Sequence, residues 1–171
     1  MKSNATKIKS SDNLNGVYNI GEKVVHIPEG VCTITEITKM AHSGVEKDYY
    51  KLVPVMDNST AIYVSLNTSE KNIRKLRSKN ELLHILEAQK KTKTHWEKNE
   101  EKRISQMKSA IHKDDGVAIA KLIKTYYQKR KQERLCTSDN NMLKKAEQLL
   151  YSEMAEVLKT DYSNLRSKIF E

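Results

Sequence analysis

The sequence predicts an α+β protein in which a small β-barrel is followed by an all-helical domain. Short runs rich in β-branched residues, separated by turn residues, occupy residues 17–77. From Ser78 onward, apolar residues recur at spacings of three and four, as they do on amphipathic helices. With 37% hydrophobic and 31% charged residues among 171, the composition favours two small cores over one large core.

The β-rich part is expected to form an SH3-like or Tudor-like barrel. Turn residues stand at Pro28–Gly30, His42–Gly44 and Asp57–Ser59, and each turn is short enough to join antiparallel neighbours. The four or five strands between them are predicted at residues 23–27, 31–39, 48–56 and 60–66, with 73–76 as the fifth. A flat sheet of this size would bury too little apolar surface, so we expect it to curl. Residues 1–16 have no apolar period and are predicted to be a flexible tail.

A capping box marks the first predicted helix. The Ser78 hydroxyl can accept a hydrogen bond from a free backbone N–H, and the Glu81 carboxylate can reach back to the start of the helix. Residues 87–93 then have almost no apolar anchor, and three of them are lysines: Lys90, Lys91 and Lys93. We therefore interpret residues 78–93 as a helix and a basic hinge between the two domains.

Residues 94–171 are predicted to form an all-helical domain. Thr94 and Glu97 have the spacing of a second capping box, which would place Trp96 in the first turn of a helix. Two more helices are expected to begin at Asp114 or Asp115 and at Thr137 or Ser138, and a short one to span 164–170. Tyr126 and Tyr127 are adjacent, so we expect one in the core and the other at its rim.

Charge indicates a possible partner. The net charge is +9, and the excess is concentrated in the middle of the chain, where residues 78–137 hold 15 basic and 8 acidic side chains. A face that meets nucleic-acid phosphates would have this balance, and so would a solvated lysine-rich helix.

Other function classes lack support. Cys32 and Cys136 are far apart, no histidines are grouped as metal ligands, and five glycines provide no phosphate-binding loop. We therefore expect no catalysis and no cofactor. The N-terminus lacks the apolar core of a secretory signal, and no stretch approaches the ~18 apolar residues of a membrane span, so a cytoplasmic location is expected.

Trp96 is the first candidate for a functional residue. It could simply pack on a neighbouring element, which is the commoner fate of a single tryptophan. Alternatively, an exposed indole could insert at a DNA base step while nearby cations neutralise phosphates. The cations that would serve this role are Lys90, Lys91, Lys93, Lys98, Lys102 and Arg103.

Two stretches of the sequence resemble the CarD/CdnL family of bacterial transcription regulators. The first is YNIGEKVVHIPEGVCTITEI with the later DYYKLVP, and the second is AIAKLIKTYYQKRKQERLCTSDNNMLKKAEQLLYSEMA, preceded by Trp96 and the Lys102–Arg103 pair. The resemblance implies a non-enzymatic, monomeric protein. Its β-domain would bind the RNA polymerase β subunit, and its helical domain would bind the upstream edge of the promoter bubble, with Trp96 as a wedge.

The sequence departs from the family's pattern at two places, one in each domain. The family's polymerase-contacting arginines fall near Met40 and Tyr63 here, and Lys39 is the nearest cation, so these three are the predicted polymerase contacts. The family's basic residues closely follow the tryptophan, and either Lys98 or the Lys102–Arg103 pair can match them. An adaptor that binds proteins through the barrel, with Trp96 merely packed, is the alternative function.

Overall fold

The computed structural model describes residues 18–42, 44–162 and 164–165. The predicted tail at 1–16 and most of the predicted helix at 164–170 lie outside these residues. The described chain divides into two compact units. The β unit comprises residues 18–26 and 31–75, and the helical unit comprises residues 27–30 and 76–165.

Within the described residues, the β unit contains a five-stranded antiparallel sheet in the order β4-β3-β2-β1-β5. The strands are β1 (Lys23–His26), β2 (Gly30–His42), β3 (Val45–Pro54), β4 (Ile62–Ser65) and β5 (Ile73–Arg74). All five predicted strands are present, including the fifth. The sequence patterns missed the short 3-10 helix Leu66–Thr68 and α1 (Ser69–Asn72), which connect β4 to β5.

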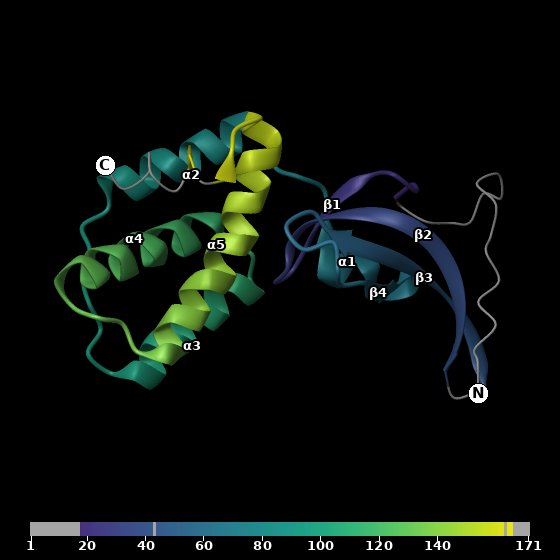
Figure 1. Ribbon diagram of the computed structural model, residues 1–171, viewed down its shortest axis with the longest axis horizontal. Helices are drawn as coiled ribbons and strands as arrows, with labels where there is room; N and C mark the ends of the chain where they lie inside the picture. Colours follow the sequence, from purple (N-terminus) through teal and green to yellow (C-terminus); the bar gives the residue numbers. More distant parts are fainter. Residues whose placement is uncertain (1–17, 43, 163, 166–171) are drawn as a thin grey trace. The chain divides into compact units, whose positions relative to one another are not determined.

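The β unit has its own hydrophobic core, built on the curved sheet that Figure 1 shows. Apolar side chains from all five strands meet there: Val24, Cys32, Ile34, Tyr50, Leu52, Val64 and Ile73. Tyr18, ahead of β1, closes this core, because its backbone N–H donates to the Tyr50 hydroxyl at 3.2 Å. A register shift in β2 between Ile34 and Glu36 adds local twist to the two longest strands. The predicted curling of the sheet therefore has a physical basis in burial and in this irregularity.

Four main helices of the described residues build the helical unit: α2 (Lys79–Lys91), α3 (Glu100–His112), α4 (Gly116–Gln132) and α5 (Thr137–Leu158). The Ser78 capping box is confirmed, since Glu81 N–H donates to the Ser78 hydroxyl and the Glu81 carboxylate accepts from Ser78 N–H. Asp115 caps α4, which confirms one of the two predicted starts. None of the described helices is long and apolar enough to cross a bilayer.

The prediction of a helix opening at Thr94 is wrong. The α3 helix begins at Glu100, because Asn99 is its N-cap and accepts a hydrogen bond from Lys102 N–H at 2.9 Å. The Glu97 carboxylate accepts from Asn99 N–H and does not reach back toward residue 94. Trp96 therefore lies in a non-helical segment between α2 and α3 and not in a helical turn.

The basic segment 87–93 is also not a break between the two units. Residues up to Lys91 continue α2, and this helix belongs to the helical unit. Gln89 is buried and its Nε2 donates to the Ala120 carbonyl at 2.8 Å. This polar anchor attaches α2 to α4, and an apolar pattern cannot reveal it.

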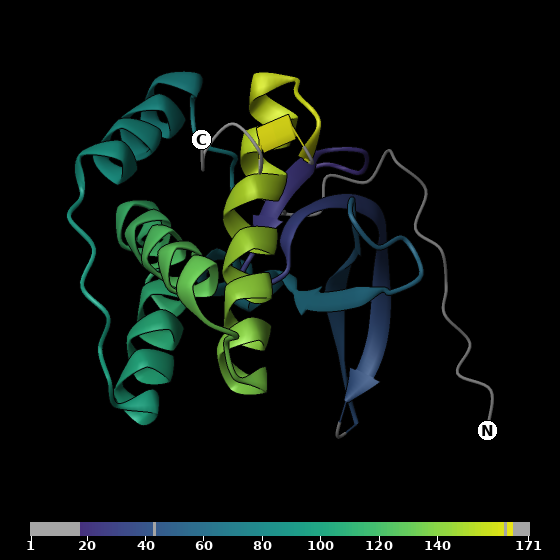
Figure 2. The ribbon, with the colours of Figure 1, turned by 60° about the vertical axis from the view of Figure 1, so that its left-hand side comes forward.

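The α4 helix lies among α2, α3 and α5 (Figures 1 and 2). Tyr126 and Tyr127 are 1% and 7% exposed, so the prediction that one lies at the rim is wrong. Neighbouring residues of a helix point about 100° apart. A helix covered on three sides can therefore bury two consecutive side chains.

Cys136 is the N-cap of α5, where its sulfur accepts from Asp139 N–H at 3.5 Å. A serine oxygen is a stronger acceptor at this position, so Cys136→Ser is expected to raise the free energy of unfolding by up to about 1 kcal/mol. Chemical denaturation measures the change. As a control, Cys32→Ser places a hydroxyl in the β-unit core, where Cys32 is 0% exposed, and is expected to destabilise the protein. A loss of stability in Cys136→Ser would contradict the capping role.

Candidate nucleic-acid interface

Trp96 lies in a segment that we call the strap, residues 92–99, which connects α2 to α3 without helical structure. The indole is half-buried. Its ring centroid lies 5.3 Å from that of Tyr126 on α4, and the two rings are inclined by 71°. The strap therefore presents an aromatic side chain that is backed by the helical core and still partly open to solvent.

Two cations face the Trp96 ring. The guanidinium carbon of Arg103 lies 4.4 Å from the ring centroid, and Lys129 Nζ lies 5.6 Å from it. Both distances are within the range of cation–π attraction. The indole is thus held between an aromatic edge and positive charge, which restricts its orientation.

Arg103 also links the strap to α5. Its Nε and NH2 donate to the two carboxylate oxygens of Asp139 at 3.1 and 2.7 Å. Its NH1 donates to the Glu97 and Lys98 carbonyls, both at 2.9 Å. Burial by itself raises the pKa of Asp139, but the hydrogen bonds from Arg103 and Cys136 and the charge of Arg103 lower it below its usual value. Asp139 is therefore ionised at neutral pH and forms a bidentate pair with Arg103.

This geometry changes the role of one predicted DNA contact. Arg103 is 8% exposed, and it donates four hydrogen bonds to Asp139 and to the strap carbonyls. A guanidinium in this position is not available to a phosphate in the free protein. We therefore assign Arg103 to the support of Trp96 and not to the DNA-facing surface.

Lys124 of α4 fixes the other end of the strap. Its ammonium group donates to the carbonyl oxygens of Gln89, Lys90 and Thr92 at 3.0, 2.8 and 3.0 Å. A cation there also interacts favourably with the C-terminal end of the α2 dipole. Thr94, further along the strap, shares a hydrogen bond with Gln128 of α4.

The five other predicted DNA-contacting cations are all exposed: Lys90, Lys91, Lys93, Lys98 and Lys102. They lie at the end of α2, in the strap and in the first turn of α3, on both sides of Trp96 in the chain. Lys98 and Lys102 are both exposed, so both alternatives for the basic residue after Trp96 stay open. The Glu97 carboxylate has a lowered pKa, chiefly because it accepts a hydrogen bond from the Asn99 backbone, and it adds a negative charge within the strap.

The predicted polymerase contacts do not share one face of the sheet. Tyr63 on edge strand β4 is opposite Lys51, and Met40 is opposite Lys47, which lies four residues from Lys51 on the same strand. Met40 and Tyr63 therefore share a face, and Lys39 lies on the other, because side chains alternate along a strand. Tyr63 is 45% exposed, Lys39 is exposed and Met40 is half-buried.

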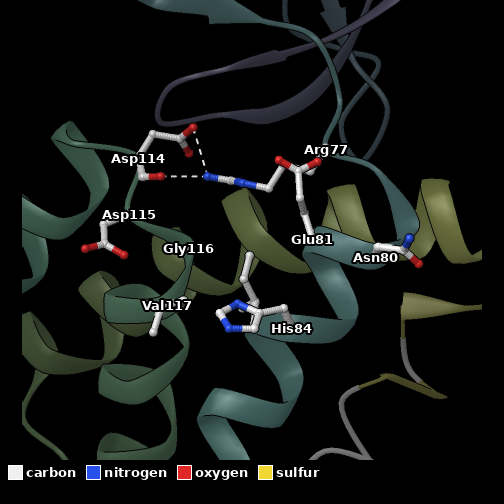
Figure 3. A pocket seen from close by; sticks show the side chains of 9 residues that line it. Arg77, Asn80, Glu81, His84, Asp114, Asp115, Gly116 and Val117 are labelled. Carbon is white, nitrogen blue, oxygen red and sulfur yellow. Dashed lines mark hydrogen bonds and ion pairs between the residues drawn. The ribbon is translucent and has the colours of Figure 1, made fainter.

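A second polar cluster surrounds Arg77 in the helical unit (Figure 3). Arg77 NH1 donates to the Glu153 carboxylate at 2.7 Å, and NH2 donates to the Asp114 carbonyl at 2.6 Å and lies 3.0 Å from its carboxylate. The adjoining open pocket is lined by Arg77, Asn80, Glu81, His84, Ile85, Asp114, Asp115, Gly116 and Val117. Because Arg77 is already paired with two acidic residues, this cluster is a structural connection among α2, the α3–α4 turn and α5.

No group of three or more His, Cys, Asp or Glu side chains in the described part of the chain is arranged to hold a metal ion. The sequence assigned no role beside Trp96 to four residues that the structure places around the strap: Lys124, Tyr126, Lys129 and Asp139. The three-residue spacing of Cys136 and Asp139 is typical of the start of a helix, and it is a local sequence signal that could have placed Asp139 in the first turn of α5.

The small curved β unit followed by a helical unit defines a two-domain protein with a Tudor-like first domain. A family model for the CarD-like/TRCF RID domain matches residues 18–77, and one for the CarD C-terminal domain matches residues 81–170. The chain therefore belongs to the CarD family, and the predicted fold class is confirmed. Membership identifies a transcription-associated regulator that interacts with RNA polymerase. No curated protein matches the chain.

Proposed function

We propose that this protein modulates the stability of the promoter open complex by binding both the RNA polymerase β subunit and the upstream edge of the DNA bubble. One observation carries the DNA-binding part of this proposal. The half-buried Trp96 indole is backed by Tyr126 and Arg103 in a non-helical strap that is flanked by exposed lysines.

An aromatic wedge and nearby cations act on different parts of DNA. The indole inserts at an unstacked base step at the edge of the bubble, where the cost of separating bases has already been met by melting. The lysines neutralise phosphates and release condensed counterions. Because this site exists only in melted DNA, the protein shifts the population toward the open complex. A preference of ~1.4 kcal/mol for the melted state changes that equilibrium about tenfold.

The β unit supplies the polymerase contact in this proposal. Strand β4 is at one edge of the sheet, and its Tyr63 side chain is exposed. An edge strand offers unpaired backbone groups to a partner protein, and exposed aromatic side chains often anchor interfaces. We assign Tyr63 and Met40 to one contact face and Lys39 to a peripheral charge contact. The protein would act as a monomer in the bacterial cytoplasm, without a cofactor and without catalysing a reaction.

The test is the half-life of the open complex on a fork promoter with cognate polymerase. Wild-type protein is expected to lengthen the half-life, and Trp96→Ala is expected to reduce this lengthening about tenfold because the wedge is lost. Polymerase binding by the isolated variant is measured in parallel and should be unchanged. Trp96→Phe, which keeps a smaller ring, is expected to retain part of the effect.

Other outcomes would change the proposal. If wild-type protein binds polymerase but leaves the half-life unchanged, the protein-interaction adaptor replaces the open-complex regulator. If Trp96→Ala retains the full effect, the protein regulates the open complex without a tryptophan wedge.

A further inference from the structure

The strap is connected to α5 through one guanidinium group. Arg103 uses NH1 for two strap carbonyls and uses Nε and NH2 for the carboxylate of Asp139. The face of the same group lies over the Trp96 ring, 4.4 Å from its centroid. The position of the guanidinium therefore determines two things together: the path of the strap after Trp96 and the surface on which the indole rests.

Asp139 determines where that guanidinium lies. A planar guanidinium that makes a two-bond contact with a carboxylate has little rotational freedom, unlike one held by a single bond. Asp139 is itself fixed, because it is 2% exposed, lies in the first turn of α5 and is bonded to the Cys136 cap. Its carboxylate faces Arg103 from α5, whereas the aromatic and cationic neighbours described for the indole belong to α3 and α4.

We infer that Asp139 is a positioning residue for the Trp96 wedge, which it orients through Arg103 without facing the DNA. This inference rests on the proposed function, since it concerns the same site. If the Asp139 charge is removed, Arg103 loses its bidentate partner, and the indole loses one of the three groups that hold it, while Tyr126 and Lys129 remain. The wedge is then presented in several orientations, and only a fraction of molecules can insert it.

The first experiment measures the indole directly in the free full-length protein. Trp96 is the only tryptophan, so intrinsic fluorescence reports on it alone. Asp139→Asn is nearly isosteric and is expected to increase acrylamide quenching and shift the emission to longer wavelength. The control Glu101→Gln removes the same charge from an exposed residue in the first turn of α3 and should leave both signals unchanged.

The second experiment is a double-mutant cycle on the open-complex half-life, at a temperature where every variant is folded. Asp139→Asn is expected to reduce the wild-type effect about tenfold, the scale of one lost hydrogen bond to a charged group. In a Trp96→Ala background, the same substitution should have no further effect, because its action passes through the indole. If Asp139 only stabilised the fold, Asp139→Asn would reduce the effect on the half-life by the same factor in the wild-type protein and in Trp96→Ala.

The outcomes separate this inference from the proposed function. If Trp96→Ala has the same effect on the half-life as wild-type protein, the proposal that Trp96 is a wedge is wrong. The fluorescence experiment alone then decides whether Asp139 positions the indole. If Trp96→Ala acts as proposed but Asp139→Asn matches Glu101→Gln in both experiments, the inference is overturned. An effect of Asp139→Asn that persists without Trp96 would also overturn it.

Discussion

Replacing Arg77 with methionine is expected to lower the free energy of unfolding of the helical unit by about 3–5 kcal/mol, because it removes the guanidinium that balances the charge of a buried carboxylate. The Glu153 side chain is 0% exposed and accepts hydrogen bonds from both the backbone N–H and the NH1 of Arg77, at 2.6 and 2.7 Å. Removal of the guanidinium also breaks its bonds to Asp114 at the α3–α4 turn. Denaturant unfolding followed by Trp96 fluorescence measures the change, since the only tryptophan lies in the helical unit.

Two further variants sharpen this result. Arg134→Met changes an exposed arginine and is expected to alter the free energy of unfolding by less than about 0.5 kcal/mol. The double variant Arg77→Met/Glu153→Met replaces the pair with apolar groups and is expected to recover much of the loss, since the buried negative charge is then absent as well. An Arg77→Met protein as stable as Arg134→Met would show that Glu153 is adequately solvated without the guanidinium.

Binding to fork DNA is expected to weaken several hundredfold between 50 and 200 mM salt. Five exposed lysines around the strap, if each neutralises one phosphate, give a log-log slope of about −4.5. Fluorescence anisotropy of labelled fork DNA with full-length protein measures the slope. The adaptor alternative predicts no DNA binding of this kind.

The surface responsible for the slope can be located with paired variants. Changing Lys90 and Lys91 to glutamine is expected to reduce the slope by about 2, as two phosphate contacts are lost. Changing the equally exposed Lys144 and Lys145 of α5 to glutamine leaves the strap intact and should not change the slope. Equal reductions in both variants would indicate diffuse attraction to the helical unit and not a site at the strap.

The elements that pattern analysis predicted correctly have local causes. The strands β1 to β4 each contain β-branched residues and are separated by turn residues, and the Ser78 capping box joins residues three positions apart. Such signals need no knowledge of distant contacts. The fold class and the family resemblance could therefore be obtained before the structure.

The incorrect predictions concern residues whose structure depends on contacts with residues far away in the sequence. The Thr94–Glu97 pattern is a valid capping signal, but Arg103 binds the Glu97 and Lys98 carbonyls and Asn99 caps the helix further on. The sequence predicted that Arg103 is a surface cation. In the structure it is buried and paired with Asp139, which lies 36 residues further along the chain. Periodicity describes one helix at a time and cannot count the neighbours of α4, which is why the burial of both tyrosines was missed.

Fixing the strap at both ends has a consequence for the thermodynamics of DNA binding. Ordering a flexible backbone costs about 1–2 kcal/mol per residue, so a mobile strap over residues 92–99 would add on the order of 10 kcal/mol to the cost of association. Lys124 and Arg103 order this segment during folding, in the absence of DNA. Conformational entropy is then lost before the encounter, and more of the contact energy appears as affinity. Changes that loosen either end should therefore weaken DNA binding through a more unfavourable binding entropy, even when every residue that touches DNA is retained.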